Sequence, residues 1–114
     1  MTQRVVITGM GCISPLGNTP GDTWASAVAG RSGAGPITHF DTTGFDTKIA
    51  AEVKGFDPVA RFGRKEARRM DRFSQLAMGA SEDAIKDSGL VITDDNRERI
   101  GIYIGTGIGG LNTC

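Results

Sequence analysis

The chain has 114 residues, of which 39% are hydrophobic, and its 13 basic and 13 acidic side chains give a net charge of zero. This length allows one domain with a modest core, and the balanced charge argues against nucleic acid as a partner. No stretch approaches the roughly 20 apolar residues that span a bilayer, so no membrane partner is expected. The 17 glycines are about twice the usual share of about 7% and indicate many tight turns.

The cysteines and the histidine predict no metal site and no disulfide framework. Cys12, Cys114 and His39 fit no recognised metal-ligand spacing. No base stands beside Cys12, which is therefore interpreted as an inert thiol rather than a nucleophile. The apolar run after Arg4 is interrupted by glycines and lacks a cleavage-site pattern, so it is not a secretory signal. A soluble protein of a reducing compartment is expected, in the cytoplasm or an organellar matrix.

The first elements are predicted to be a strand and a short helix. Arg4–Gly9 contains three β-branched residues in succession, which favours a strand. After a glycine-rich loop, Asn18 or Thr19 is expected to cap a helix that has Pro20 just inside it. Gly30 is expected to end that helix.

A turn-rich excursion and a long helix follow. Residues 31–58 are irregular, and Ile49–Val53 is the one strand-like island, short and at an edge. A helix is predicted from Arg64 to about Ser88, ended by Gly89. Gly79 and the small alanines should allow close approach of a sheet or another helix. Its buried face is marked by Phe73, Leu76, Ala77, Ala80, Ala84 and Ile85.

The last predicted element is a second strand that leads into a glycine-rich loop. The apolar run from Ile100 enters a loop with four glycines in six residues, at Gly105, Gly107, Gly109 and Gly110. This run and the first one are predicted to be adjacent strands of a parallel α/β sheet with flanking helices. Ligands of such sheets bind where the strands end.

This glycine loop has two interpretations. Gly105-x-Gly107-x-x-Gly110 formally satisfies a dinucleotide-binding fingerprint. The helix and the acidic residue that the fingerprint requires would need chain beyond residue 114. Ile108, a bulky apolar residue between glycines, favours a buried plug or a pocket wall over a phosphate site.

A basic run precedes the middle of the long helix. Six basic and two acidic residues give it a local charge of six minus two, or +4; they are Arg61, Arg64, Lys65, Arg68, Arg69 and Arg72, with Glu66 and Asp71. Spacing by four places the basic residues on one helical face, with Ala67, Met70 and Phe73 opposite. Such a face is either simply solvated or binds an acidic protein. Nucleic acid is disfavoured because no aromatic residues alternate with the basic ones.

Three of these motifs occur in the same order in the β-ketoacyl-acyl-carrier-protein synthases, and the chain resembles that family over nearly its whole length. The first is VVITGMG at 5–11 with SPLG at 14–17. The second is RKEARRMDRF at 64–73, and the third is IGTGIGGL at 104–111. The most similar subgroup is the type II synthase of bacterial and organellar fatty acid synthesis.

The resemblance implies a thiolase-like α/β fold, a layered α-β-α-β-α sandwich built as a homodimer. Residues 1–114 would be its N-terminal part, without an internal boundary. It implies decarboxylative Claisen condensation of acyl groups with malonyl groups, both carried on the phosphopantetheine of acyl carrier protein, without a further cofactor or a metal. The family's catalytic cysteine and two histidines lie downstream of these motifs. The 114 residues alone are therefore expected to be inactive and weakly stable.

The resemblance also implies two binding roles. The basic motif matches the surface on which this family docks its acidic carrier protein, at Lys65, Arg68, Arg69 and Arg72. The glycine loop matches the wall or gate of the acyl-chain pocket, at Gly107, Ile108 and Gly109. Two alternatives stay open: a non-catalytic carrier-protein-binding module or subunit, and, less favoured, a dinucleotide-binding domain. A related condensing enzyme of polyketide assembly also remains open.

Overall fold

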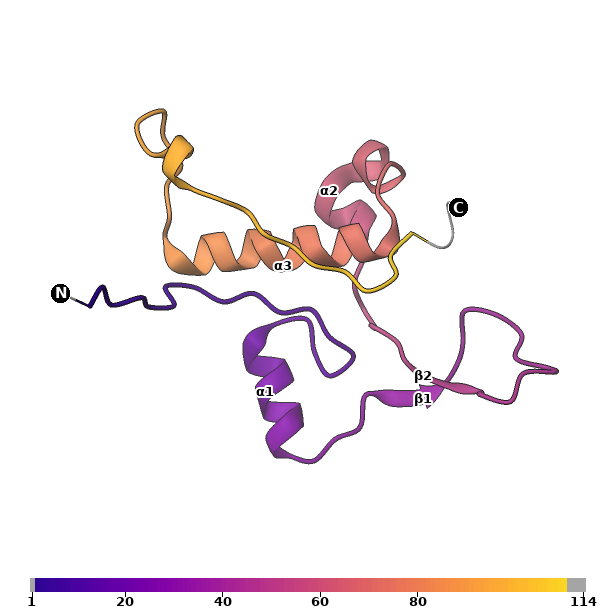
Figure 1. The fold of residues 1–114 in the computed structure, drawn as a ribbon. Coiled ribbons are helices and arrows are strands. Elements are labelled where there is room, and N and C mark those ends of the chain that lie inside the picture. Colours follow the sequence, from indigo (N-terminus) through magenta and orange to yellow (C-terminus); the bar gives the residue numbers. More distant parts are fainter. Residues whose placement is uncertain (1, 111–114) are drawn as a thin grey trace. The chain divides into compact units, whose positions relative to one another are not determined.

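The computed structural model describes residues 2–110 (Figure 1). Its elements are α1 (Pro20–Val28), β1 (Ala34–Pro36), β2 (Ile49–Ala51), α2 (Pro58–Ala67), α3 (Arg72–Ser88) and a 3-10 turn, η1 (Arg97–Arg99). The chain forms two compact units. One, the helical unit, comprises Met1–Gly11 and Asp57–Cys114; the other, the small unit, is Cys12–Phe56. In the part of the chain that is described, no helix is both long and apolar enough to cross a membrane.

In the small unit, α1 confirms the predicted helix and its cap. The Thr19 hydroxyl accepts a hydrogen bond from the backbone N–H of Asp22 at 3.1 Å, and Pro20 is the first helical residue. After the helix, Gly30 adopts a positive φ of 65°. The apolar face of α1 is uncovered within the described residues, because Trp24 is 72% exposed.

The small unit also contains an antiparallel strand pair of which only one strand was predicted. β2 confirms a strand within Ile49–Val53, and its Ala50 pairs with Gly35 of β1. β1 could not be recognised because its sequence, Ala-Gly-Pro, lacks strand-forming residues. Beyond the pair, the Thr38 backbone N–H and hydroxyl donate to the Glu52 carboxylate at 3.0 and 2.7 Å.

In the helical unit, two helices replace the single helix predicted from Arg64 to Ser88. α2 begins six residues earlier than Arg64, because the Asp57 carboxylate accepts hydrogen bonds from the backbone N–H groups of the first helical turn at 2.8 and 3.1 Å. The prediction is also wrong between the helices. The Gln75 side-chain amide donates to the carbonyls of Ala67 and Met70, at 2.9 and 3.1 Å, and these are groups that a continuous helix would bond internally.

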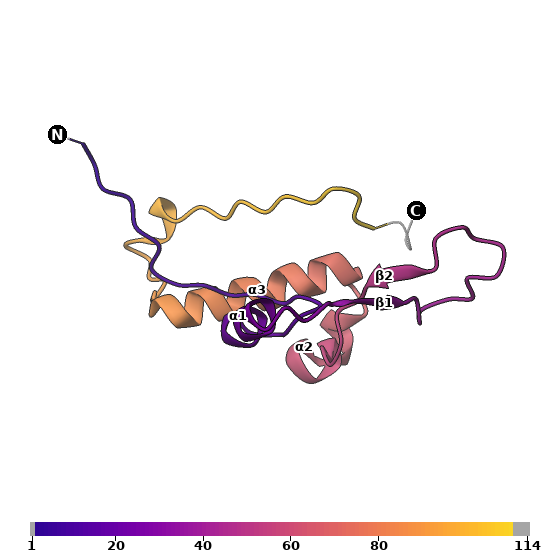
Figure 2. The ribbon, with the colours of Figure 1, turned by 90° about the horizontal axis from the view of Figure 1, so that it is seen from below.

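The two predicted parallel strands are not formed by the described residues, so that prediction is wrong for this part of the chain. Residues 2–13 and 100–106 are assigned to no paired strand. Within the helical unit, the end of the first segment and the second segment extend along the direction of α3 (Figures 1 and 2). Val5 is 94% exposed and Tyr103 is fully exposed. β-branched composition favours extended backbone, but a strand also needs a hydrogen-bonding neighbour.

The first segment packs tightly on α3 through its glycines. The small residues of that helix were expected to admit a sheet or another helix, and an unpaired extended segment takes that place. A Cβ atom on Gly11 would overlap the carbonyl oxygen of Ala80, and one on Gly9 would overlap the backbone beside Ala84. The Met10 backbone N–H donates to the Asp87 carboxylate at 2.9 Å. The core is thin: of the hydrophobic residues described, only Ala67 is buried.

Candidate functional site

Most of the basic run is exposed, but the run does not form one helical face. The part of the run that follows Arg61 is called here the basic surface and consists of Arg64, Lys65, Arg68, Arg69 and Arg72. Arg64 and Lys65 lie in the last turn of α2, where positive charge interacts favourably with the helix dipole. The break between α2 and α3 follows, and Arg72 is the first residue of α3. The shared helical face is therefore a corrected prediction, because the helix ends at Ala67.

Most of the basic surface is available to a partner. Arg64, Lys65 and Arg68 are exposed and form no ion pair with another described residue. Arg69 lies 3.6 Å from the Glu66 carboxylate, but both side chains are more than half exposed. Such a pair is worth about 0–1 kcal/mol, so an acidic ligand can displace Glu66. Ala67 is buried at 6% exposure, which confirms that it faces away from the basic surface.

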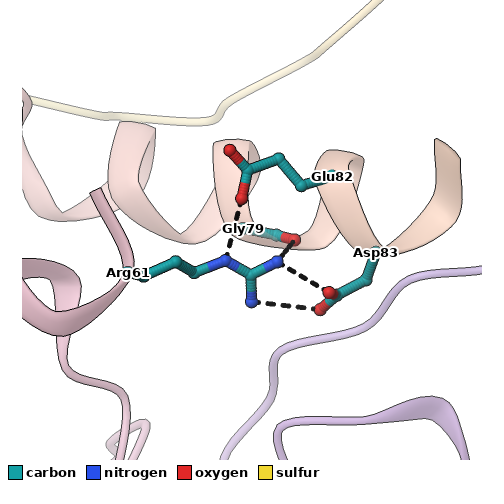
Figure 3. A network of polar contacts seen from close by, with 4 residues as sticks. All are labelled: Arg61, Gly79, Glu82 and Asp83. Carbon is teal, nitrogen blue, oxygen red and sulfur yellow. Dashed lines mark hydrogen bonds and ion pairs between the residues drawn. The ribbon is translucent and has the colours of Figure 1, made fainter. Parts of the chain in front are cut away.

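Arg61 is different, because its charge is used inside the helical unit (Figure 3). Its Nε donates to Glu82 of α3 at 2.9 Å, and its two terminal nitrogens donate to the Asp83 carboxylate at 2.6 and 3.2 Å. One of them also donates to the Gly79 carbonyl at 2.8 Å. Hydrogen bonds to Asp83 and then Glu82 raise the pKa of Arg61 above its ordinary value.

A hollow of about 400 Å³ lies at the start of α3. It is lined by Asp71, Arg72, Phe73, Leu76, Ile108, Gly109 and Gly110. Gly109 lies close to the Phe73 ring, where an added Cβ atom would come within 2.7 Å of ring carbons. Ile108 is at the edge, 82% exposed. The structure thus brings two of the three predicted pocket residues together with Arg72, whereas Gly107 is not among the lining residues.

The remaining candidates form no catalytic set among the described residues. The Cys12 sulfur is half-buried and 3.6 Å from the Thr23 hydroxyl, which is not a base. His39 is 69% exposed, and its Nε2 is 3.8 Å from Glu52. Within residues 2–110 no group of three or more potential ligands could hold a metal ion. Cys114 lies outside the described residues.

Sequence reasoning missed one feature of this site, the attachment of Arg61 to α3. Arg61 binds the adjacent acids Glu82 and Asp83 of that helix. Their partner is 21 and 22 residues away, and only the crossing of α2 and α3 brings it to them. No local pattern marks such a pair.

Comparison with known proteins matches the chain to one family over nearly its whole length. The family model for the N-terminal domain of β-ketoacyl synthases matches residues 2–113. The 3-oxoacyl-[acyl-carrier-protein] synthase 2 of Vibrio cholerae is 50% identical over 109 residues, which are 96% of this chain and 26% of that protein. The protein of the same name from Synechocystis sp. is 51% identical with the same coverage, and that of Staphylococcus aureus strain N315 is 48% identical over 111 residues, 97% of this chain and 27% of that protein.

A solved structure agrees with the sequence relatives. The ishigamide ketosynthase/chain length factor superposes with a TM-score of 0.68 at 42% identity, covering 80% of this chain and 22% of that one. The chain spans about a quarter of the length of the curated relatives it matches. Because the family model covers residues 2–113 and the three motifs occur in the family's order, this chain belongs to the β-ketoacyl synthase family, of which it matches the N-terminal domain.

Proposed function

We propose that residues 1–114 are the N-terminal part of a β-ketoacyl-acyl-carrier-protein synthase that elongates fatty acids. The observation that carries this proposal is the identity of about 50% to 3-oxoacyl-[acyl-carrier-protein] synthases over 96% of the chain. The complete enzyme would be a homodimer with the thiolase-like layered sandwich, working in the cytoplasm or an organellar matrix. In that sandwich the exposed segments 4–9 and 100–104 would find strand neighbours, which they do not have among residues 2–110.

The proposed reaction is a decarboxylative Claisen condensation in two transfers. A cysteine thiolate first attacks the acyl thioester, so the acyl group moves to the enzyme and the carrier thiol leaves. The malonyl thioester then loses carbon dioxide, and its carbanion attacks the enzyme-bound acyl carbon. A carbon–carbon bond forms, the acyl–sulfur bond breaks, and the cysteine thiolate is regenerated; one proton is consumed overall. Apart from phosphopantetheine, which carries the substrates, no cofactor or metal is required.

Residues 1–114 would contribute binding to this reaction rather than bond chemistry. In the family the nucleophile and the two histidines that stabilise developing charge correspond to neither Cys12 nor His39. Backbone N–H groups would hold the thioester oxyanion.

The basic surface would dock the acidic carrier protein, with Lys65, Arg68, Arg69 and Arg72 as its contacts. Support comes from the exposure of Lys65 and Arg68 and from the absence of an ion pair on either among the described residues. Unpaired cations raise the local concentration of an acidic partner and accelerate its association. Because docking depends on charge complementarity, the affinity of this surface for the carrier protein should fall as salt is added.

The hollow at the start of α3 would form part of the acyl-chain pocket. Ile108 and Gly109 lie beside the apolar side chains of Phe73 and Leu76, which suits a hydrocarbon chain. Gly107 would leave the backbone before Ile108 free to turn, so that Ile108 can act as a wall or a gate. Arg72 lines the same hollow and would connect the docking surface to the pocket entrance.

Charge reversal in the protein at its native length tests the docking role. Arg68→Glu should raise the dissociation constant for acyl carrier protein by about tenfold, equivalent to about 1.4 kcal/mol, and the loss should shrink at high salt. Lys86→Glu is the matched control, because Lys86 is an exposed cation about 20 Å along α3 from Arg72. Equal effects of the two reversals, measured by calorimetry, would contradict the proposal.

A second candidate is a non-catalytic subunit that binds the carrier protein. It is favoured by one observation: the described residues combine a basic surface with an apolar hollow but contain no nucleophile with a base beside it. The intact mass of the protein purified from its source distinguishes the two, together with a condensation assay. A mass several times 12.0 kDa with condensation supports the synthase, and carrier binding without condensation supports the subunit.

A further inference from the structure

Arg61 lies immediately before the basic surface yet is bound to α3 by four hydrogen bonds. Three go to the carboxylates of Glu82 and Asp83 and one to the carbonyl of Gly79 (Figure 3). The Arg61 guanidinium binds the Asp83 carboxylate through two nitrogens. The Arg61 side chain is only 26% exposed. Bidentate pairing fixes orientation as well as distance. α2 is therefore held at a defined position on α3.

The backbone between Arg61 and the basic surface is bent at one glycine. Gly63 has φ 78° and ψ 157°, which interrupts the helical conformation inside α2. On the far side of the surface, Gln75 holds the carbonyls of Ala67 and Met70. The segment that carries Arg64, Lys65 and Arg68 is thus attached to α3 at both ends. Loss of Arg61 would remove the attachment on the N-terminal side of this segment and keep the one made by Gln75.

Arg61 also neutralises charge beside the basic surface. Glu82 and Asp83 are adjacent anions, and with Arg61 they sum to −1 instead of −2. Arg61 and Glu82 line one hollow of about 390 Å³ together with Glu66, which is the ion-pair partner of Arg69 in the basic surface. Without Arg61, both carboxylates would repel an acidic partner near this hollow.

From this arrangement we infer that Arg61 is a positioning residue for carrier-protein docking, which acts by fixing the α2 end of the basic surface on α3 and by cancelling the charge of Glu82 and Asp83. The inference rests on the proposed docking function and deepens it. Arg61 itself does not contact the carrier protein. Its effect should therefore appear only with substrates that are presented by the carrier.

The test compares one acyl group on two supports, acyl carrier protein and coenzyme A, in the protein at its native length. Arg61→Gln should raise the dissociation constant and the KM for the carrier-linked substrate by about fivefold. The kcat, and the KM for the coenzyme A thioester, should change by less than about twofold, because that substrate does not use the basic surface. Assays are run well below the unfolding temperature of each variant.

Two further variants separate the causes. Arg61→Lys should recover part of the loss, because an ammonium keeps the charge but cannot bind three groups in one plane. Adding Glu82→Gln and Asp83→Asn to Arg61→Gln should recover the part that comes from repulsion.

An unchanged carrier dissociation constant in Arg61→Gln, or an equal loss with both substrates, would overturn the inference. Arg68→Glu, measured in parallel, distinguishes this failure from that of the proposed function. If Arg68→Glu weakens carrier binding and Arg61→Gln does not, only the positioning role fails. If neither variant weakens it, the docking surface is wrong and the inference falls with it.

Discussion

Arg61 and Arg68 are seven positions apart and carry the same charge, but the fold uses them in opposite ways. Three residues of α3 accept hydrogen bonds from Arg61. Arg68 is exposed and forms no ion pair among the described residues. A charge count assigns both to one +4 run. The structure separates a cation that holds two helices together from cations that are available to a partner.

The largest effect is expected on stability, when Arg61 and its hydrogen bonds to α3 are removed. Arg61→Met should lower the free energy of unfolding by about 1–2 kcal/mol, because Glu82 and Asp83 lose their partner. This loss of stability is small because water screens the ion pair, in which Glu82 is 47% exposed. Arg68→Met should change the same free energy by less than about 0.5 kcal/mol. Chemical denaturation of both variants at native length measures the difference, and equal losses would remove the distinction between the two cations.

A smaller loss is expected at Asp57, a satisfied anion that caps α2. Its carboxylate accepts hydrogen bonds from the backbone N–H groups of Val59 and Ala60. Asp57→Ala should cost about 1 kcal/mol. Asp46→Ala is the matched control, because Asp46 is exposed and has no hydrogen bond among the described residues. If thermal unfolding shows the same midpoint for both variants, the cap does not stabilise α2.

Local sequence signals predicted the elements whose causes are local. Thr19, Pro20 and Gly30 delimit α1 by capping chemistry alone, and the small residues of α3 indicated the close approach that Gly9 and Gly11 make. The break between α2 and α3 was missed, because it depends on where the buried amide of Gln75 finds its acceptors. The strands were overpredicted, since β-branched residues specify extended backbone but not its neighbour.

In the candidate site, too, the sequence predicted what depends on neighbouring residues and missed what depends on residues far apart in the chain. The basic composition of residues 61–72 predicted a charged surface, and the resemblance gave it an acidic partner. Neither could sort Arg61 from Arg68, because the acids that bind Arg61 come from another helix. The hollow that joins Arg72 to Ile108 likewise depends on two segments that are 36 residues apart in the sequence.

The smallest effect is expected from Glu52 of the small unit, a carboxylate that accepts hydrogen bonds. It should appear as a pH dependence of the stability of that unit. Hydrogen bonds from the Thr38 backbone N–H and then its hydroxyl lower the pKa of Glu52 from its ordinary value of 4.5. A lowered folded-state pKa means that the ionised carboxylate stabilises the fold at pH values above about 4.5, and that this contribution is lost as the pH falls through the folded-state pKa.

NMR titration of the Thr38 amide should therefore give a midpoint below 4.5. Thr38→Val removes only the hydroxyl donor, so the midpoint should move part of the way back towards 4.5, while the backbone hydrogen bond maintains the rest of the shift. A midpoint at 4.5 in the unmodified protein would show that the Thr38 hydrogen bonds do not favour the ionised form of Glu52. The contrast between hydrogen-bonded charges and charges available to a partner would then hold only in the helical unit.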